Sequence, residues 1–138
     1  MSDSTTDPKI DTVTTIYEAF GRGDVATILD QVADDVDWAS ESFSAKAAPW
    51  HGIHKGRGEV PGFFQGIAES VEVTEFTVLS MAANETDVFA TIRFGMRSTA
   101  TGITGSMELH HWFQFEDGKV ARYRGTEDTA LTAEILAL

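Results

Sequence analysis

The sequence lacks cysteine and has little positive charge. None of its 138 residues is a cysteine, which excludes disulfide bonds, thiol catalysis and cysteine-ligated metal sites. Only 10 residues are Lys or Arg, against 22 Asp and Glu, and the formal net charge is -12. Nucleic acids and anionic membranes are bound by basic surfaces, so neither is an expected partner of this chain.

Long apolar runs are missing as well. No run approaches the roughly 20 residues of a membrane span, and the polar start MSDSTTDPK has no signal-peptide character. We therefore expect a soluble cytoplasmic protein. The hydrophobic share, 42%, is ordinary for a globular fold. The length predicts a single domain over residues 7–138, preceded by a disordered segment at residues 1–6.

Helix signals concentrate in the first half of the chain. Asp7 followed by Pro8 is typical of a helix start, and apolar residues continue at helical spacing as far as Phe20. Asp24 is placed to cap a second, short helix. A third helix is expected over about residues 58–70, with Pro61 in its first turn. Residues 41–58 are rich in glycine and small residues and are predicted to form a loop.

Strand signals fill the second half of the chain. Apolar residues alternate with polar ones, most clearly from Val88 to Met96, and Glu116-Asp117-Gly118 is a strong turn signal. Asp128 is a candidate cap for a short last helix. The expected strands are residues 71–83, 88–96, 106–115 and 119–127, after a short strand that follows residue 33.

Helices followed by a run of long antiparallel strands predict an α+β fold. One curved sheet would wrap around the N-terminal helices as a cone. Such a cone leaves an apolar pocket between the sheet and the helices, which is a natural place for a small apolar ligand.

Three stretches of the chain resemble a known family. They are YEAFGRGDVATILDQVADDVDW (17–38), PWHGIHKGRGEV (49–60) and HHWFQFEDGKVARYRGTEDT (110–129). Together they are similar to the nuclear transport factor 2-like (cystatin-like) fold, in its ketosteroid isomerase and SnoaL-like polyketide cyclase branch. The resemblance covers nearly the whole chain. It implies a cofactor-free enzyme that isomerises, cyclises or ring-opens a small molecule, and a homodimer formed through the outer face of the sheet.

The resemblance places particular residues at the family's working positions. The general-base aspartate of the ketosteroid isomerases falls on Ser40, and their helix tyrosine falls on Ile16, next to Tyr17. Their oxyanion-hole aspartic acid falls on His111, where the SnoaL-like cyclases carry a histidine that faces the pocket. The last-strand aspartate of the cyclases falls near Gly125.

His111 is the first candidate catalytic residue. Neighbours in a strand point to opposite faces, so His111 shares a face with Leu109 and Phe113, while His110 shares the other face with Trp112. Because Leu109 and Phe113 are apolar, the face that they share with His111 is predicted to point inward. Histidine titrates near neutrality and could act there as a general acid or base. The alternative is a core histidine bonded to a neighbouring backbone group.

Glu127 and Tyr123 are the other two candidate catalytic residues. Glu127 could be a carboxylate whose pKa is raised by an apolar pocket, or it could orient His111. The alternative is a glutamate at the rim of the pocket. Tyr123 could donate a hydrogen bond to a developing enolate oxygen, although any buried tyrosine needs a partner.

The remaining predicted residues would shape the pocket rather than react. Trp50 and His51 lie in the 41–58 loop, a candidate lid. His51 and His54 have a spacing that permits metal binding, but a solvated loop is the favoured interpretation, and no metal or cofactor is expected. The predicted pocket consists of Tyr17, Trp38, Ser40, Trp50, Phe63, Ile92, Phe94, Met96, Leu109 and Phe113.

A second class of function stays open at this point. The same pocket could hold a ligand without turning it over, or the chain could serve as an assembly module. The absence of carboxylates at positions 40 and 125 favours that alternative.

Overall fold

The helices come first in the chain and the long strands follow. The computed structural model describes residues 7–42, 44 and 46–138, so the prediction of disorder at residues 1–6 lies outside the described residues. Within the described part, the elements are α1 (Pro8–Gly21), α2 (Val25–Leu29), β1 (Val32–Ser40), β2 (Gly52–Lys55), α3 (Val60–Ser70), β3 (Val71–Ala83), β4 (Asp87–Ser98), β5 (Thr104–Glu116), β6 (Lys119–Thr126) and α4 (Thr129–Leu136).

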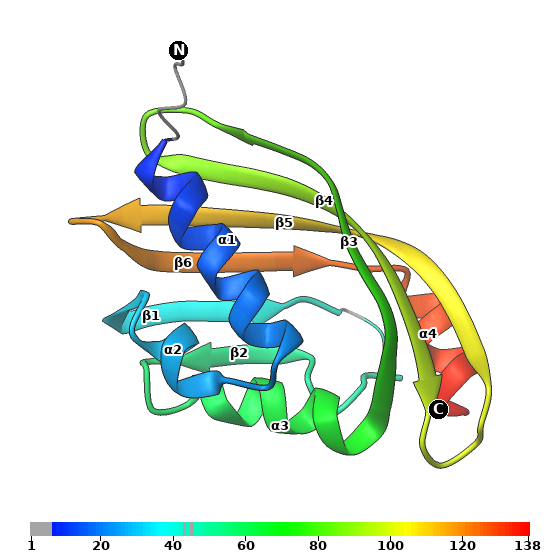
Figure 1. Cartoon of the computed structure of the whole chain (residues 1–138). Coiled ribbons are helices and arrows are strands. Elements are labelled where there is room, and N and C mark those ends of the chain that lie inside the picture. The colour runs from blue at the N-terminus through cyan, green and yellow to red at the C-terminus, as the bar shows by residue number, and fades with distance from the viewer. Residues whose placement is uncertain (1–6, 43, 45) are drawn as a thin grey trace.

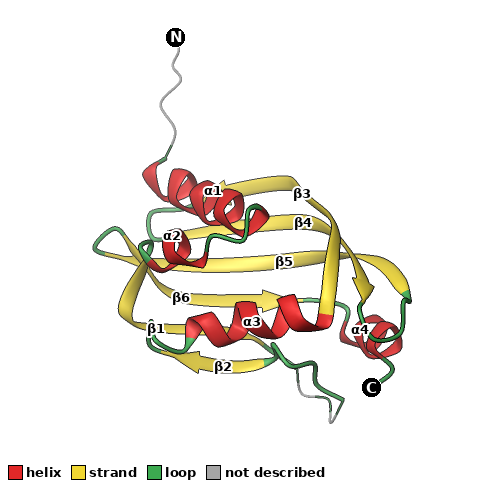
Figure 2. Cartoon of the chain, turned by 60° about the horizontal axis from the view of Figure 1, so that its bottom comes forward, coloured by secondary structure: helices red, strands yellow, loops and turns green. Residues whose placement is uncertain are grey.

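The six strands form one curved sheet in the order β2-β1-β6-β5-β4-β3. Every neighbouring pair is antiparallel except β1 and β6, which run parallel. Figures 1 and 2 show α1, α2 and α3 on one side of the sheet and α4 at the end where β4 and β5 bend. This is the α+β architecture predicted from the sequence.

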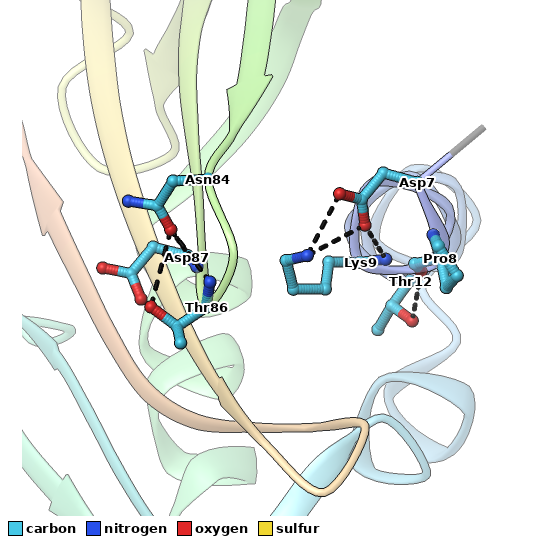
Figure 3. A network of polar contacts seen from close by, with 7 residues as sticks. All are labelled: Asp7, Pro8, Lys9, Thr12, Asn84, Thr86 and Asp87. Carbon is cyan, nitrogen blue, oxygen red and sulfur yellow. Dashed lines mark hydrogen bonds and ion pairs between the residues drawn. The ribbon is translucent and has the colours of Figure 1, made fainter.

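The helix starts follow from short local signals. Asp7 accepts a hydrogen bond from the backbone N–H of Lys9 at 2.8 Å, and Pro8 occupies the first turn of α1 (Figure 3). Asp24 accepts from Thr27 N at 3.1 Å to cap α2, and Asp128 accepts from Leu131 N at 3.0 Å to cap α4. Each carboxylate satisfies a backbone donor that has no partner inside the helix.

The turn between β3 and β4 uses the same chemistry. The side-chain oxygen of Asn84 accepts hydrogen bonds from the backbone N–H groups of Thr86, at 2.9 Å, and Asp87, at 2.8 Å (Figure 3). An asparagine that bonds to its own downstream backbone is a common way to close a turn. These hydrogen bonds close the turn between Ala83, the last residue of β3, and Asp87, the first residue of β4.

Alternation along β5 decides which side chains face the helices. Met107, Phe113 and Phe115 are buried, while Glu108 and His110 are exposed. His111 is partly buried on the same face as Phe113. The inward and outward faces of β5 are those that the sequence predicts.

The prediction that residues 41–58 are a loop is wrong for one segment. Gly52–Lys55 forms strand β2, which pairs antiparallel with the end of β1. The strand has only four residues and is mostly exposed, so it carries no apolar alternation that a sequence could reveal. Gly52 and Gly56 bound it with positive φ angles of 104° and 83°, and these glycines produced the loop-like composition.

No helix in the described part of the chain has the length and apolar character needed to cross a membrane.

Candidate functional site

A cavity lies between the inner face of the sheet and the helices. The volume open to the centre of a water-sized molecule inside this cavity is about 70 Å³. Eight of the predicted pocket residues line it, together with residues outside that predicted set. The first group is Tyr17, Trp38, Ser40, Trp50, Phe63, Phe94, Leu109 and Phe113; the second includes Ile16, Phe20, Phe64, Ile67, Val71, Phe76, Met107, Gly125 and Thr126.

Two predicted pocket residues do not line the cavity. Ile92 and Met96 are on the inner face of β4 but are 0% and 1% exposed in the packed core. Alternation assigns a face to each residue of a strand, but it does not say how far along the strand a hollow extends. Met96 pairs with Gly105, toward α4, where the sheet is packed against that helix.

His111 is hydrogen-bonded to a tyrosine from the first helix. The Tyr17 hydroxyl lies 2.8 Å from Nδ1 of His111, across 94 residues of sequence. Burial raises the pKa of Tyr17 well above its ordinary value, so the phenol keeps its proton and needs an acceptor. With Nδ1 as that acceptor, the imidazole carries its own proton on Nε2.

The imidazole of His111 is neutral. Burial is the main cause that lowers its pKa to about 3; the neighbouring His110 acts in the same direction and the Glu127 carboxylate in the opposite one. Within the described residues, Nε2 of His111 has no hydrogen-bond partner. His111 therefore presents a neutral N–H donor at the wall of the cavity, rather than a proton acceptor.

Glu127 is engaged elsewhere than the sequence suggested. Its Oε1 accepts from Nε1 of Trp50 at 2.9 Å and from Nε2 of His51 at 3.0 Å. Its Oε2 accepts from the hydroxyl of Thr132 on α4. Within the described residues, Glu127 accepts no hydrogen bond from His111, and it is Tyr17 that bonds to the imidazole and orients it. We call Trp50, His51, Glu127 and Thr132 the Glu127 cluster.

The protonation states inside the Glu127 cluster are fixed by its geometry. Nδ1 of His51 accepts a hydrogen bond from the backbone N–H of Ala48 at 2.8 Å, so the single proton of the ring is on Nε2, facing Glu127. Burial alone raises the pKa of Glu127, but the hydrogen bonds from His51, Thr132 and Trp50 outweigh it and lower the pKa. Glu127 is thus an ionised carboxylate, and the expectation of a raised pKa is wrong.

The segment that carries Trp50 is packed into the fold rather than solvated. The His51 side chain is 2% exposed. On α3, a Cβ added to Gly66 would lie 3.1 Å from the backbone of Pro49, so this glycine permits the close approach of the segment. The sequence placed His51 in a candidate lid and noted its spacing to His54, but it gave no sign of a bond to Glu127, and nothing in it pointed to Thr132.

Tyr123 stacks on Trp38, and its hydroxyl lies where Gly125 has no side chain. Its ring stacks on Trp38 with 4.1 Å between ring centroids. Its hydroxyl lies over Gly125, in the space that a Cβ at that position would fill. Burial raises the pKa of Tyr123 although hydrogen bonding with Ser40 works against the shift, so the phenol is a neutral donor.

Metal binding finds no support in the described part of the chain, where no group of three or more metal-ligating side chains comes together. His51 is bonded to Glu127, and the ring of His54 packs on Phe63 with 5.8 Å between centroids. The cavity wall thus combines aromatic surface, the neutral donors of His111 and Tyr123, and one ionised carboxylate that already accepts three hydrogen bonds. Such a wall can hold and polarise an uncharged oxygen atom.

The chain matches one family model and is similar in fold to several solved structures. The family model described as "SnoaL-like domain" matches residues 13–123. A search of curated proteins found no match. An NTF2-like protein of unknown function from Burkholderia pseudomallei has a TM-score of 0.86 and 20% identity, over 96% of this chain and 100% of that one.

Two further solved structures are similar over almost their whole length. TerC, co-crystallised with polyporic acid, has a TM-score of 0.84 and 19% identity, over 96% of this chain and 100% of that one. A candidate polyketide cyclase from Xanthomonas campestris has a TM-score of 0.76 and 21% identity, over 94% of this chain and 96% of that one. These similarities establish the NTF2-like fold predicted from the sequence.

Proposed function

Because the chain belongs to the SnoaL-like domain family, we propose that it is a cofactor-free enzyme acting on an apolar small molecule with a carbonyl or epoxide oxygen. The reaction would be a proton transfer that leads to isomerisation, cyclisation or ring opening. The similarity to a candidate polyketide cyclase supports this class of chemistry.

One observation carries the proposal: the hydrogen bond between Tyr17 and His111 at the wall of a cavity lined mainly by apolar and aromatic side chains. It leaves Nε2–H of His111 free to donate to a substrate oxygen. Tyr123 supplies a second neutral donor on the neighbouring strand. Fixed donors in a largely apolar pocket stabilise an oxygen that gains negative charge in the transition state more than they stabilise the ground state.

Glu127 is the proposed proton acceptor, as the ionised carboxylate that lines the cavity. Its three hydrogen bonds make it a weak base. A weak base removes a proton only from an acidic carbon, such as one next to both a carbonyl and an aromatic ring, so the proposed substrates carry such a carbon.

A second candidate function is ligand binding without turnover. The saturated hydrogen bonding of Glu127 favours it, because a carboxylate that accepts three hydrogen bonds loses stabilisation when it takes a proton.

Deuterium exchange tests the proposal and separates it from mere binding. The probe is 2-tetralone, an apolar ketone with an acidic carbon beside its ring, and proton NMR in D₂O follows exchange at that carbon. We expect the protein to accelerate exchange, and His111→Ala or Tyr123→Phe to slow it about 100-fold. His110→Ala, on the exposed face, is the matched control and should exchange like the wild type. Binding without accelerated exchange would favour the second function.

We also propose that the outer face of the sheet forms a homodimer interface. Phe89 is 46% exposed there, its ring is parallel to that of Trp112, and Arg122 lies 5.6 Å from the Trp112 ring. Sedimentation should give the mass of two chains for the wild type and of one chain for Phe89→Glu. Ile103→Glu, in the turn between β4 and β5 and away from the sheet face, is the control and should remain a dimer.

A further inference from the structure

Three strands bring His111, Gly125 and Ser40 into one row across the inner face of the sheet. His111 on β5 pairs with Gly125 on β6, and Gly125 pairs with Ser40 on β1. All three residues line the cavity. The glycine in the middle leaves a gap between an imidazole and a hydroxyl.

The hydroxyl of Tyr123 fills this gap. A Cβ added to Gly125 would collide with the Tyr123 hydroxyl and would lie 3.0 Å from the ring carbon that carries it. The same Cβ would lie 3.2 Å from Oγ of Ser40. The Tyr123 and His111 rings are 5.2 Å apart between centroids. Oη of Tyr123 thus lies over Gly125, the middle residue of the row, and Oγ of Ser40 is near the same point.

The ring of Tyr123 cannot turn freely, but its hydroxyl proton can. Stacking on Trp38 at 4.1 Å and an angle of 23° fixes the plane of the ring. The phenolic proton still has two directions open to it, toward Ser40 or toward the cavity. If the Ser40 hydroxyl donates to Oη, the phenolic proton cannot point toward Ser40 and points toward a ligand in the cavity.

We propose that Ser40 is a positioning residue: it donates to Oη of Tyr123, so that the phenolic proton and Nε2–H of His111 point at the same ligand oxygen. The inference deepens the proposed function and rests on it for the identity of the ligand. Gly125 is essential to this arrangement, since any side chain at that position displaces the tyrosine hydroxyl. The oxygen bound there is uncharged, because each group aimed at it is a neutral donor.

Infrared difference spectroscopy of bound 2-tetralone, labelled with ¹³C at the carbonyl, tests the positioning role. Hydrogen bonding lowers the carbonyl stretching frequency. We expect the lowest frequency with the wild type and an upward shift with Ser40→Ala that approaches the shift with Tyr123→Phe. Ser40→Thr keeps the hydroxyl and should restore the wild-type frequency. Affinity should fall about fivefold in Ser40→Ala, which corresponds to about 1 kcal/mol for one neutral hydrogen bond.

A ligand-free measurement tests the placement of the hydroxyl. Gly125→Ala should lower the urea midpoint of the wild type. In the Tyr123→Phe background the same substitution should cost clearly less, because the colliding hydroxyl is gone. Equal costs in the two backgrounds would show that the hydroxyl is not over Gly125 and would overturn the proposal.

The outcomes separate this inference from the proposed function. An unchanged carbonyl frequency in Ser40→Ala, or a wild type that does not bind 2-tetralone with a lowered frequency, overturns the positioning role. A frequency that depends on Ser40, in a protein that accelerates no deuterium exchange, supports the positioning role and refutes the proposed catalysis.

Discussion

Replacing Glu127 by leucine removes the acceptor of three buried hydrogen bonds. Thr132 can redirect its proton to the carbonyl of Asp128, 3.1 Å away, but the N–H groups of Trp50 and His51 have no second acceptor in the described residues. Each buried donor left unpaired costs about 1–3 kcal/mol, so the substitution should lower the free energy of unfolding by about 2–6 kcal/mol. With a typical dependence on urea, the midpoint falls by roughly 1–3 M.

Glu127→Gln is the matched control for this loss. Its amide oxygen can still accept from Trp50 and His51, and its amide nitrogen can donate to the Thr132 hydroxyl, whose proton then goes to Asp128. Only the extra strength of bonds to a charged acceptor is lost, about 1 kcal/mol. Urea unfolding followed by tryptophan fluorescence should therefore rank wild type first, glutamine second and leucine third. A leucine variant as stable as the glutamine variant would refute the assignment of these hydrogen bonds.

The same comparison has a defined pH dependence. The pKa of Glu127 in the folded state is below its ordinary value of 4.5. The contribution of its charge is therefore complete above about pH 4.5 and is lost as the pH falls through the folded-state pKa. The stability gap between wild type and Glu127→Leu should be widest at neutral pH and should narrow below pH 4.5.

Three other predictions follow from the packing. NMR should find the His111 imidazole neutral at pH 5, because its pKa in the folded state is lowered from 6.5 to about 3. The folded state is therefore destabilised as the pH falls from 6.5 toward 3, since the unfolded chain takes up the proton more readily. An imidazole that titrates near 6.5 would contradict its burial. Ile92→Ala should lower the free energy of unfolding by about 2–5 kcal/mol, yet 2-tetralone affinity should be unchanged because Ile92 lies outside the cavity wall. Asp128→Ala should lower the free energy of unfolding by about 1 kcal/mol, measured by thermal unfolding, through the lost cap of α4.

Features encoded by neighbouring residues could be predicted from the sequence. The caps Asp7, Asp24 and Asp128 each act within three residues of their own position, and the faces of β5 follow from alternation alone. Strand β2 could not be predicted in this way. Its four residues are held by pairing with β1, so the information that makes them a strand lies in their partner.

The chemistry of the site was the least predictable part, because it depends on distant contacts. The sequence identified His111, Glu127 and Tyr17, but the hydrogen bond that orients His111 joins residues 94 positions apart. The bonds from Trp50 and His51 to Glu127 span 77 and 76 positions. A face assignment shows that such side chains share an interior, but only the closed fold determines which of them meet.

The Glu127 cluster joins the wall of the cavity to the end of the chain. Thr132 belongs to α4, whereas Trp50 lines the cavity from a segment before α3. Fraying of the last helix therefore removes a donor from the carboxylate that holds Trp50 in place. Local unfolding of α4 and release of the Trp50 segment from the cavity wall are therefore coupled through one carboxylate, so the stability of the last helix contributes to the order of the cavity wall.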